Sequence, residues 1–120
     1  MAKLTAEAKR IVGEFHLAMI ATASKDGKPN VSLKGLQVLD DEHVGFADVA
    51  SPRTMANLRE NPQISAIVFD PATRKGCRLW GKAEILGSGD LFNAMSAELA
   101  RMKMIVKHVV RVTVGEVETF

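Results

Sequence analysis

The chain has 120 residues, a mass of 13.0 kDa and a net charge of +2, from 16 basic and 14 acidic side chains. This size predicts a single domain over residues 1–120. The near-neutral charge excludes a strongly basic nucleic-acid-binding protein and an acidic disordered segment. The single cysteine, Cys77, excludes an internal disulfide and a cysteine-based metal site, and the three histidines are too scattered to predict a local metal motif.

The start of the chain shows no targeting segment. The apolar run from Leu17 to Ala21 is far shorter than the roughly 20 residues that span a membrane. We therefore expect a cytoplasmic protein with no membrane contact.

The first half of the chain predicts a short helix and then strands joined by hairpins. Residues 4–15 carry apolar side chains on one helical face, and Thr5 is a suitable cap. Residues 17–23 are apolar at nearly every position, which predicts a strand buried on both faces. Asp26-Gly27 favours a tight hairpin. The two strands expected after it span residues 29–39 and 43–48.

The second half alternates helices and strands. Ser51 suits a helix N-cap and Pro52 the first helical position, so a helix is expected to begin here and to end before Pro62. A stripe of Leu and Met side chains predicts a third helix over residues 91–104. The last strand changes parity at Gly115, which predicts a β-bulge or a bend. The remaining strands are expected over residues 63–69, 76–86 and 107–120.

About six strands, joined early in the chain by tight hairpins, indicate an antiparallel sheet. Such a sheet hides its edges best by closing on itself. The pattern therefore predicts a mainly β fold, a small β-barrel with short helices over its openings.

The segment from Asp48 to Thr54 carries the strongest chemical signal. A strand ends there and a helix begins, so free backbone N–H groups and the helix dipole add positive potential. Arg53 adds planar donors, and Ser51 and Thr54 add hydroxyls. These groups predict a phosphate site. A capped surface helix with a solvated arginine is the alternative explanation.

Three further residues each have two interpretations. Lys34 lies in a mostly apolar strand and either reaches a ligand or points to solvent. Trp80, the only tryptophan, either lines an interface or ligand, or is covered by the third helix. Phe120 is either covered by a partner subunit or a ligand, or disordered. Apolar groups left uncovered on a small barrel favour a two-fold dimer.

Four segments occur in a characteristic order. They are Ala18-Met19-Ile20-Ala21-Thr22 with Asp26-Gly27-Lys28-Pro29, the helix Arg53 to Pro62 with its Asn-Leu-x-x-Asn-Pro ending, the strand Ile64 to Phe69, and Arg78-Leu79-Trp80-Gly81-Lys82-Ala83-Glu84. Together they resemble the FMN-binding split-barrel proteins related to pyridoxamine 5′-phosphate oxidase. The chain is most similar to the small single-domain bacterial FMN-binding proteins of that family.

The resemblance implies a six-stranded antiparallel Greek-key split barrel that forms a homodimer with two FMN sites between the subunits. It implies that Arg53 and Thr54, with Ser51 nearby, hold the FMN phosphate. The residues expected around the cofactor are Val31, Ser32, Leu33, Lys34, Asp48, Val49, Ala50, Ser51, Arg53 and Thr54, with Trp80 and Phe120 as further contacts. Gly76 stands where larger oxidases have a glutamine, and their C-terminal substrate-binding segment has no counterpart, so we do not expect oxidation of vitamin B6.

We therefore expect a small homodimeric flavoprotein that binds FMN non-covalently, with the flavin carrying the redox chemistry. No residue is placed as a general acid or base, so an oxidoreductase or electron-transfer role is favoured and the catalytic residues stay unassigned. One alternative keeps the fold but binds a deazaflavin coenzyme or haem. The other is a non-enzymatic module that binds nucleic acid or another anion through the basic cluster between Arg101 and Arg111.

Overall fold

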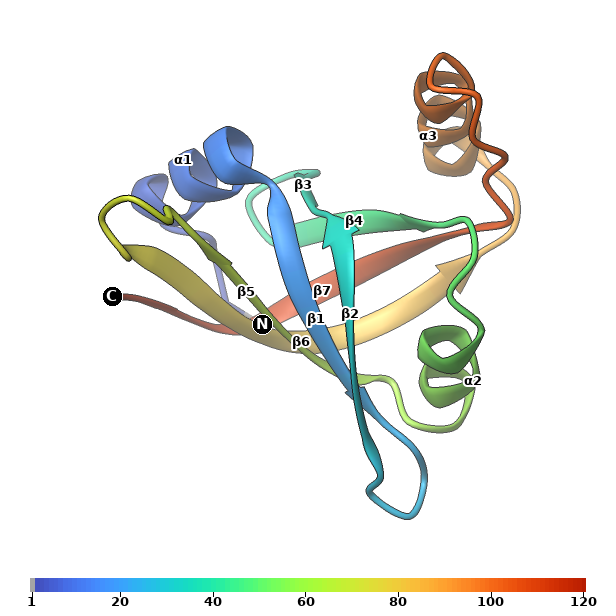
Figure 1. Ribbon diagram of the computed structural model, residues 1–120, viewed down its shortest axis with the longest axis horizontal. Coiled ribbons are helices and arrows are strands. Elements are labelled where there is room, and N and C mark those ends of the chain that lie inside the picture. The colour runs from blue at the N-terminus through green and yellow to red at the C-terminus, as the bar shows by residue number, and fades with distance from the viewer. Residues whose placement is uncertain (1) are drawn as a thin grey trace.

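The computed structural model describes residues 2–120 as a seven-stranded antiparallel sheet with three helices (Figure 1). The helices are α1 (Ala6–Phe15), α2 (Pro52–Glu60) and α3 (Asp90–Ala100). The strands are β1 (Leu17–Ala23), β2 (Pro29–Gly35), β3 (Gln37–Val38), β4 (His43–Asp48), β5 (Gln63–Phe69), β6 (Gly76–Leu86) and β7 (His108–Thr119). Their order in the sheet is β2-β1-β5-β6-β7-β4-β3.

The sheet curls until its two ends approach each other (Figure 1). Hydrogen bonds join β2 to β1, and they join β4 to β3 and β7, yet β2 and β4 lie close together. A curled antiparallel sheet of this kind is a split barrel, so the predicted mainly β fold is confirmed.

The strand count differs by one from the expected six because the strand predicted over residues 29–39 is broken at Leu36. The Leu36 side chain is buried, and its N–H donates to the carbonyl oxygen of His16 at 2.7 Å. The chain therefore leaves its pairing with β1 and turns to pair with β4 as β3.

The core lies inside the curl of the sheet and is closed on one side by α1. Thr5 caps this helix as predicted, since its Oγ1 accepts the N–H of Ala8 at 3.0 Å. Ala8, Ile11 and Val12 face the core and meet Phe46 of β4 in the same apolar cluster. Burying such side chains supplies the main stabilisation of a domain of this size.

The prediction that β1 is buried on both faces is wrong for a single chain. Ala18 and Ile20 are buried, whereas Leu17 and Met19 on the opposite face are 58% and 42% exposed. Apolar side chains on both faces of a strand indicate that both faces are covered, and here one chain covers only one of them.

The third helix is shorter than predicted, because α3 ends at Ala100 and not at Met104. Lys103 has a φ of 60°, and the N–H of Met104 donates to the carbonyl oxygen of Leu99 at 3.1 Å. A left-handed residue followed by such a bond is the usual way for a helix to stop. No helix among residues 2–120 is long and apolar enough to span a membrane.

The bulge predicted at Gly115 is confirmed. Trp80 pairs with Glu116 and Gly81 pairs with Val114, which leaves Gly115 as the extra residue on β7. The side-chain parity of β7 changes there, so Val117 packs against the core.

Candidate functional site

A cluster of polar side chains joins α2 to β2. Thr54 in the first turn of α2 is only 1% exposed, and its Oγ1 lies 2.9 Å from the Ser32 Oγ on β2. The Asn30 Nδ2 donates to the same Thr54 oxygen at 3.4 Å. Because its hydroxyl is already bonded, Thr54 orients Ser32 and Asn30, and Asn30 lines the adjoining cavity.

That cavity has a volume of about 200 Å³ and lies between the β1–β2 hairpin and α2. Its lining includes two cations, Arg53 and Lys28, and no carboxylate. It also includes the amides of Asn30 and Asn57, and the Asn57 Nδ2 donates to the Thr22 Oγ1 at 3.1 Å. A small cavity with cations and neutral donors, beside the first turn of a helix, has the chemistry that binds phosphate.

Ser51 is the N-cap residue of α2, as expected, but its hydroxyl makes no capping hydrogen bond to the helix. The Ser51 Oγ instead donates to the Asp48 Oδ1 at 2.6 Å, and the Ser51 N–H donates to the same oxygen at 3.0 Å. Asp48 thus already binds the Ser51 hydroxyl, and the expected contact of Ser51 with an anion stays a prediction.

Asp48 is 3% exposed, and its second oxygen, Oδ2, accepts from the His108 Nδ1 at 3.1 Å. Burial by itself raises the pKa of Asp48, but the hydrogen bonds from Ser51 and His108 and the charge of Lys34 hold the pKa below its ordinary value. Asp48 is thus an ionised carboxylate inside the protein, held by donors on both of its oxygens.

A larger cavity of about 740 Å³ is lined by residues of α1, β2, β3, β4 and α3. Three of the predicted site residues line it, namely Leu33, Lys34 and Val49, and the rest of its lining is mostly apolar. Burial lowers the pKa of Lys34, and the negative charge of Asp48 opposes this by raising it. A volume of this size with a few polar groups suits an aromatic ring system.

One face of β2 connects the two cavities. Asn30 lines the small cavity, Ser32 bonds to Thr54, and Lys34 lines the large cavity. Alternate residues of a strand share a face, so these three side chains form a polar line from one cavity to the other. The arrangement fits an elongated ligand with an anionic group at one end and a ring at the other.

The opposite face of β2 is apolar and open. Val31 and Leu33 are each 64% exposed. In the sheet register, Leu33 pairs with Met19 and Val31 with Ala21, and Leu17 continues the same face of β1. We call Leu17, Met19, Val31 and Leu33 the apolar face.

Within one chain, Trp80 and Phe120 lie away from both cavities. Trp80 lines a separate groove beside the bulge. Phe120 pairs with Gly76 through two backbone hydrogen bonds, and the Arg78 guanidinium lies 5.5 Å from its ring centroid. A Cβ on residue 76 would come within 2.4 Å of the Val68 carbonyl oxygen and 2.9 Å of the Phe120 ring, which explains a glycine at this position. The predicted contact of Trp80 and Phe120 with a cofactor therefore stays a prediction, and it concerns an assembled dimer.

The sequence reasoning missed four residues that the structure places at the site, namely Lys28, Asn30, Asn57 and His108. The alternation of Asn30, Ser32 and Lys34 along one strand is the signal that identifies Asn30. Nothing local identifies His108, because it reaches Asp48 from another part of the chain.

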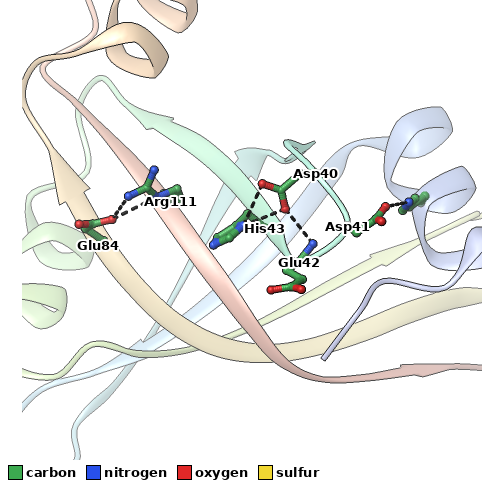
Figure 2. Close-up of polar contacts among 7 residues, drawn as sticks. Asp40, Asp41, Glu42, His43, Glu84 and Arg111 are labelled. Atoms are coloured by element: carbon green, nitrogen blue, oxygen red, sulfur yellow. Dashed lines mark hydrogen bonds and ion pairs between the residues drawn. The ribbon is translucent and has the colours of Figure 1, made fainter. Parts of the chain in front are cut away.

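The basic cluster between Arg101 and Arg111 is only partly free. Figure 2 shows Arg111 of β7 beside Glu84 of β6, and the Arg111 Nε donates to the Glu84 Oε1 at 3.1 Å. An arginine paired with a carboxylate has less positive charge to offer to an anion.

Comparison with known proteins places the chain in a family. The family model described as pyridoxamine 5'-phosphate oxidase matches residues 4–120. The chain belongs to this family. A 66-residue stretch of this chain is 42% identical to an uncharacterized protein of Methanocaldococcus jannaschii, and the match covers 52% of this chain and 44% of the relative. The match thus spans less than half the length of the curated relative.

Solved structures share the fold of this pyridoxamine 5'-phosphate oxidase family member over nearly its whole length. The HupZ protein of Group A Streptococcus is 25% identical, with a TM-score of 0.89, and the match covers 98% of this chain and 94% of HupZ. An FMN-binding protein from Syntrophomonas wolfei is 16% identical, with a TM-score of 0.84 and coverage of 93% and 82%. An F420 reductase is 17% identical, with a TM-score of 0.75 and coverage of 96% and 98%. The last two show the fold alone.

Proposed function

We propose that the protein is a homodimeric flavoprotein that binds FMN non-covalently. The observation that carries the proposal is the polar line on β2, which joins a cavity containing Arg53 and Lys28 to a larger and mostly apolar one. FMN has the matching shape, with a phosphate at one end, a hydroxylated chain and an aromatic ring. Membership of the family and the likeness to an FMN-binding protein support the same assignment.

In this proposal Arg53 and Lys28 neutralise the phosphate, and the side chains of Asn30 and Ser32 hydrogen-bond along the ligand. Thr54 orients both of these side chains from inside the protein. Lys34 lies where the ring would enter the large cavity, and Val49 forms part of its apolar wall. Bound FMN would supply electron or hydride transfer, while the chain binds it, orients it and limits its contact with water.

The apolar face supports the dimer. A second copy that packed on Leu17, Met19, Val31 and Leu33 would remove these exposed side chains from water. Leu17 and Leu33 also line the large cavity, so a partner seated there would close that cavity as well. This is the reason for placing the ring end of the site between two subunits.

Titration of the purified protein with FMN, followed by absorption and flavin fluorescence, tests the proposal. We expect saturable binding, and Arg53→Ala should weaken it by roughly 10- to 100-fold, since a charge-assisted contact to phosphate is lost. Arg59→Ala is the matched control, because Arg59 is exposed at the other end of α2 and should leave the affinity unchanged.

An unchanged spectrum and no binding on addition of FMN would contradict the proposal. A single deazaflavin-like absorption band in the purified protein would agree with the two-cavity site but would show that the cofactor is a deazaflavin and not FMN. Steeply salt-dependent binding of nucleic acid by colourless protein would favour the non-enzymatic alternative.

A further inference from the structure

Asp48 ties the segment before α2 to a distant part of the chain. Its Oδ1 accepts two hydrogen bonds from Ser51, and its Oδ2 accepts one from His108, which is 60 residues away in sequence. The backbone is joined at the same place, because the Lys107 N–H donates to the Asp48 carbonyl oxygen at 2.9 Å and Asp48 pairs with His108 in the sheet.

His108 has a specific task in this network. An ionised carboxylate only accepts hydrogen bonds, so the His108 Nδ1 carries the shared proton. Among residues 2–120 the structure gives the Asp48 Oδ2 this single hydrogen-bond partner. Burying a carboxylate oxygen without a hydrogen-bond donor is unfavourable in free energy. Without His108, the Asp48 carboxylate would rotate or admit water to regain a donor.

Such a rotation of the Asp48 carboxylate would displace the start of α2. Ser51 is the N-cap, and its carbonyl oxygen accepts the first helical hydrogen bond, from the Met55 N–H at 3.1 Å. Its amide and hydroxyl are both fixed on the Asp48 Oδ1. Arg53 follows two residues later and lines the small cavity. The orientation of the Asp48 carboxylate therefore sets the orientation of the first helical turn of α2, which carries Arg53.

We infer that His108 is a positioning residue for the anion site: acting through Asp48 and Ser51, it holds the first turn of α2 so that Arg53 points into the small cavity. The identity of the anion as the FMN phosphate rests on the proposed function, whereas the positioning of the turn does not.

A second histidine–aspartate pair in the same chain provides a control. The His43 Nδ1 lies 2.8 Å from the Asp40 Oδ1, in the turn that leads into β4 (Figure 2). The Asp40 side chain is 59% exposed, and the same carboxylate accepts the Glu42 N–H at 2.8 Å. Water replaces a lost partner at such a site, so removal of His43 should have no effect beyond the turn.

The test measures two quantities for each variant: hydrogen exchange of the Ser51 and Met55 amides without ligand, and the dissociation constant for FMN. We expect His108→Leu to speed exchange of both amides and to weaken FMN binding, each by roughly 10-fold or more. His108→Asn should restore both quantities to within about 3-fold, because its side-chain amide can donate near the position of Nδ1. His43→Leu should leave both unchanged.

His108→Gln serves if the leucine variant fails to fold, because its longer side chain places the amide near Nε2, away from Asp48. Rescue by asparagine but not by glutamine supports the inference, and equal behaviour of the two overturns it. Wild-type exchange in His108→Leu also overturns it, even if FMN binding is weaker. If the wild-type protein does not bind FMN but the exchange results are as expected, the positioning stands and the proposed cofactor is wrong.

Discussion

The α2 end of the barrel and the apolar face of β1 and β2 differ in how far one chain completes them. At the α2 end, the buried polar side chains Asp48 and Thr54 have hydrogen-bond partners from the N-cap of α2, from β2 or from β7. On the apolar face, Val31 and Leu33 point outward with most of their surface uncovered. Under the proposed function, a single chain organises the anionic end of the site, and a second copy encloses the other end.

The region around α3 also belongs to the less complete part. Ser96 Oγ on α3 is the one buried side-chain polar atom among residues 2–120 for which the structure gives no hydrogen-bond partner. Met102 and Met104, just beyond α3, are exposed and line the large cavity. Exposed methionines beside a cavity are typical of a surface that another molecule covers.

The largest effect is expected on the apolar face. Leu33→Asp should raise the dimer dissociation constant by at least about 100-fold, because an unpaired carboxylate would be buried between the subunits. The chain itself should stay folded, since Leu33 is 64% exposed in one copy. Sedimentation velocity at micromolar concentration measures the change. Ile105→Asp, at an apolar residue that is 81% exposed, is the control. Dissociation of the dimer by Ile105→Asp but not by Leu33→Asp would show that the interface lies near α3.

A smaller effect is expected inside the α2 end. Thr54→Val keeps the shape of the side chain but removes the hydroxyl that Ser32 and Asn30 bond. The free energy of unfolding should fall by about 1–3 kcal/mol, measured by chemical denaturation. Thr119→Val, at an exposed position on β7, should change it by less than about 0.5 kcal/mol. Equal losses in the two variants would show that the Thr54 hydroxyl is not a structural requirement.

The third prediction concerns pH. The folded protein lowers the pKa of Asp48, so its ionised form adds stability above the unfolded value of about 3.9. That contribution is lost as the pH falls through the lower folded value. The difference in unfolding free energy between wild type and Asp48→Asn should therefore be constant near neutral pH and shrink below about pH 4. A difference that stays constant down to the acid transition would contradict this assignment.

The smallest effect is expected for a pair outside both regions. Arg111 and Glu84 form an exposed ion pair between β7 and β6 (Figure 2). A double-mutant cycle with Arg111→Ala and Glu84→Ala should give a coupling of about 0.5 kcal/mol or less, and it should decrease with added salt. A coupling well above 1 kcal/mol would show that this pair is part of a larger network.

Elements with a strong local pattern were predictable from the sequence. The alternation from Gly76 to Leu86 gave β6 with both of its ends, and Gly115 marked the bulge. At the site, the sequence identified the start of α2 and Arg53, because a strand end, a cap and a cation follow one another directly.

The remaining features depend on contacts between distant residues. The apolar residues of β1 do not indicate whether another part of the same chain or a second chain covers them. The hydroxyl of Ser51 suits a cap equally well whether or not Asp48 takes it. The contact of His108 with Asp48 follows from the pairing of β4 with β7, which no local pattern specifies.

The pairing of β4 with β7 also has a consequence for folding kinetics. The β1–β2 hairpin closes over a few residues, whereas Asp48 meets His108 only after a loop of 60 residues has closed. Long-range pairing of this kind slows folding, to roughly milliseconds to seconds for β-rich domains. The pocket beside α2 should therefore form late in refolding. Under the proposed function, capture of FMN then follows the burial of the barrel core and does not guide it.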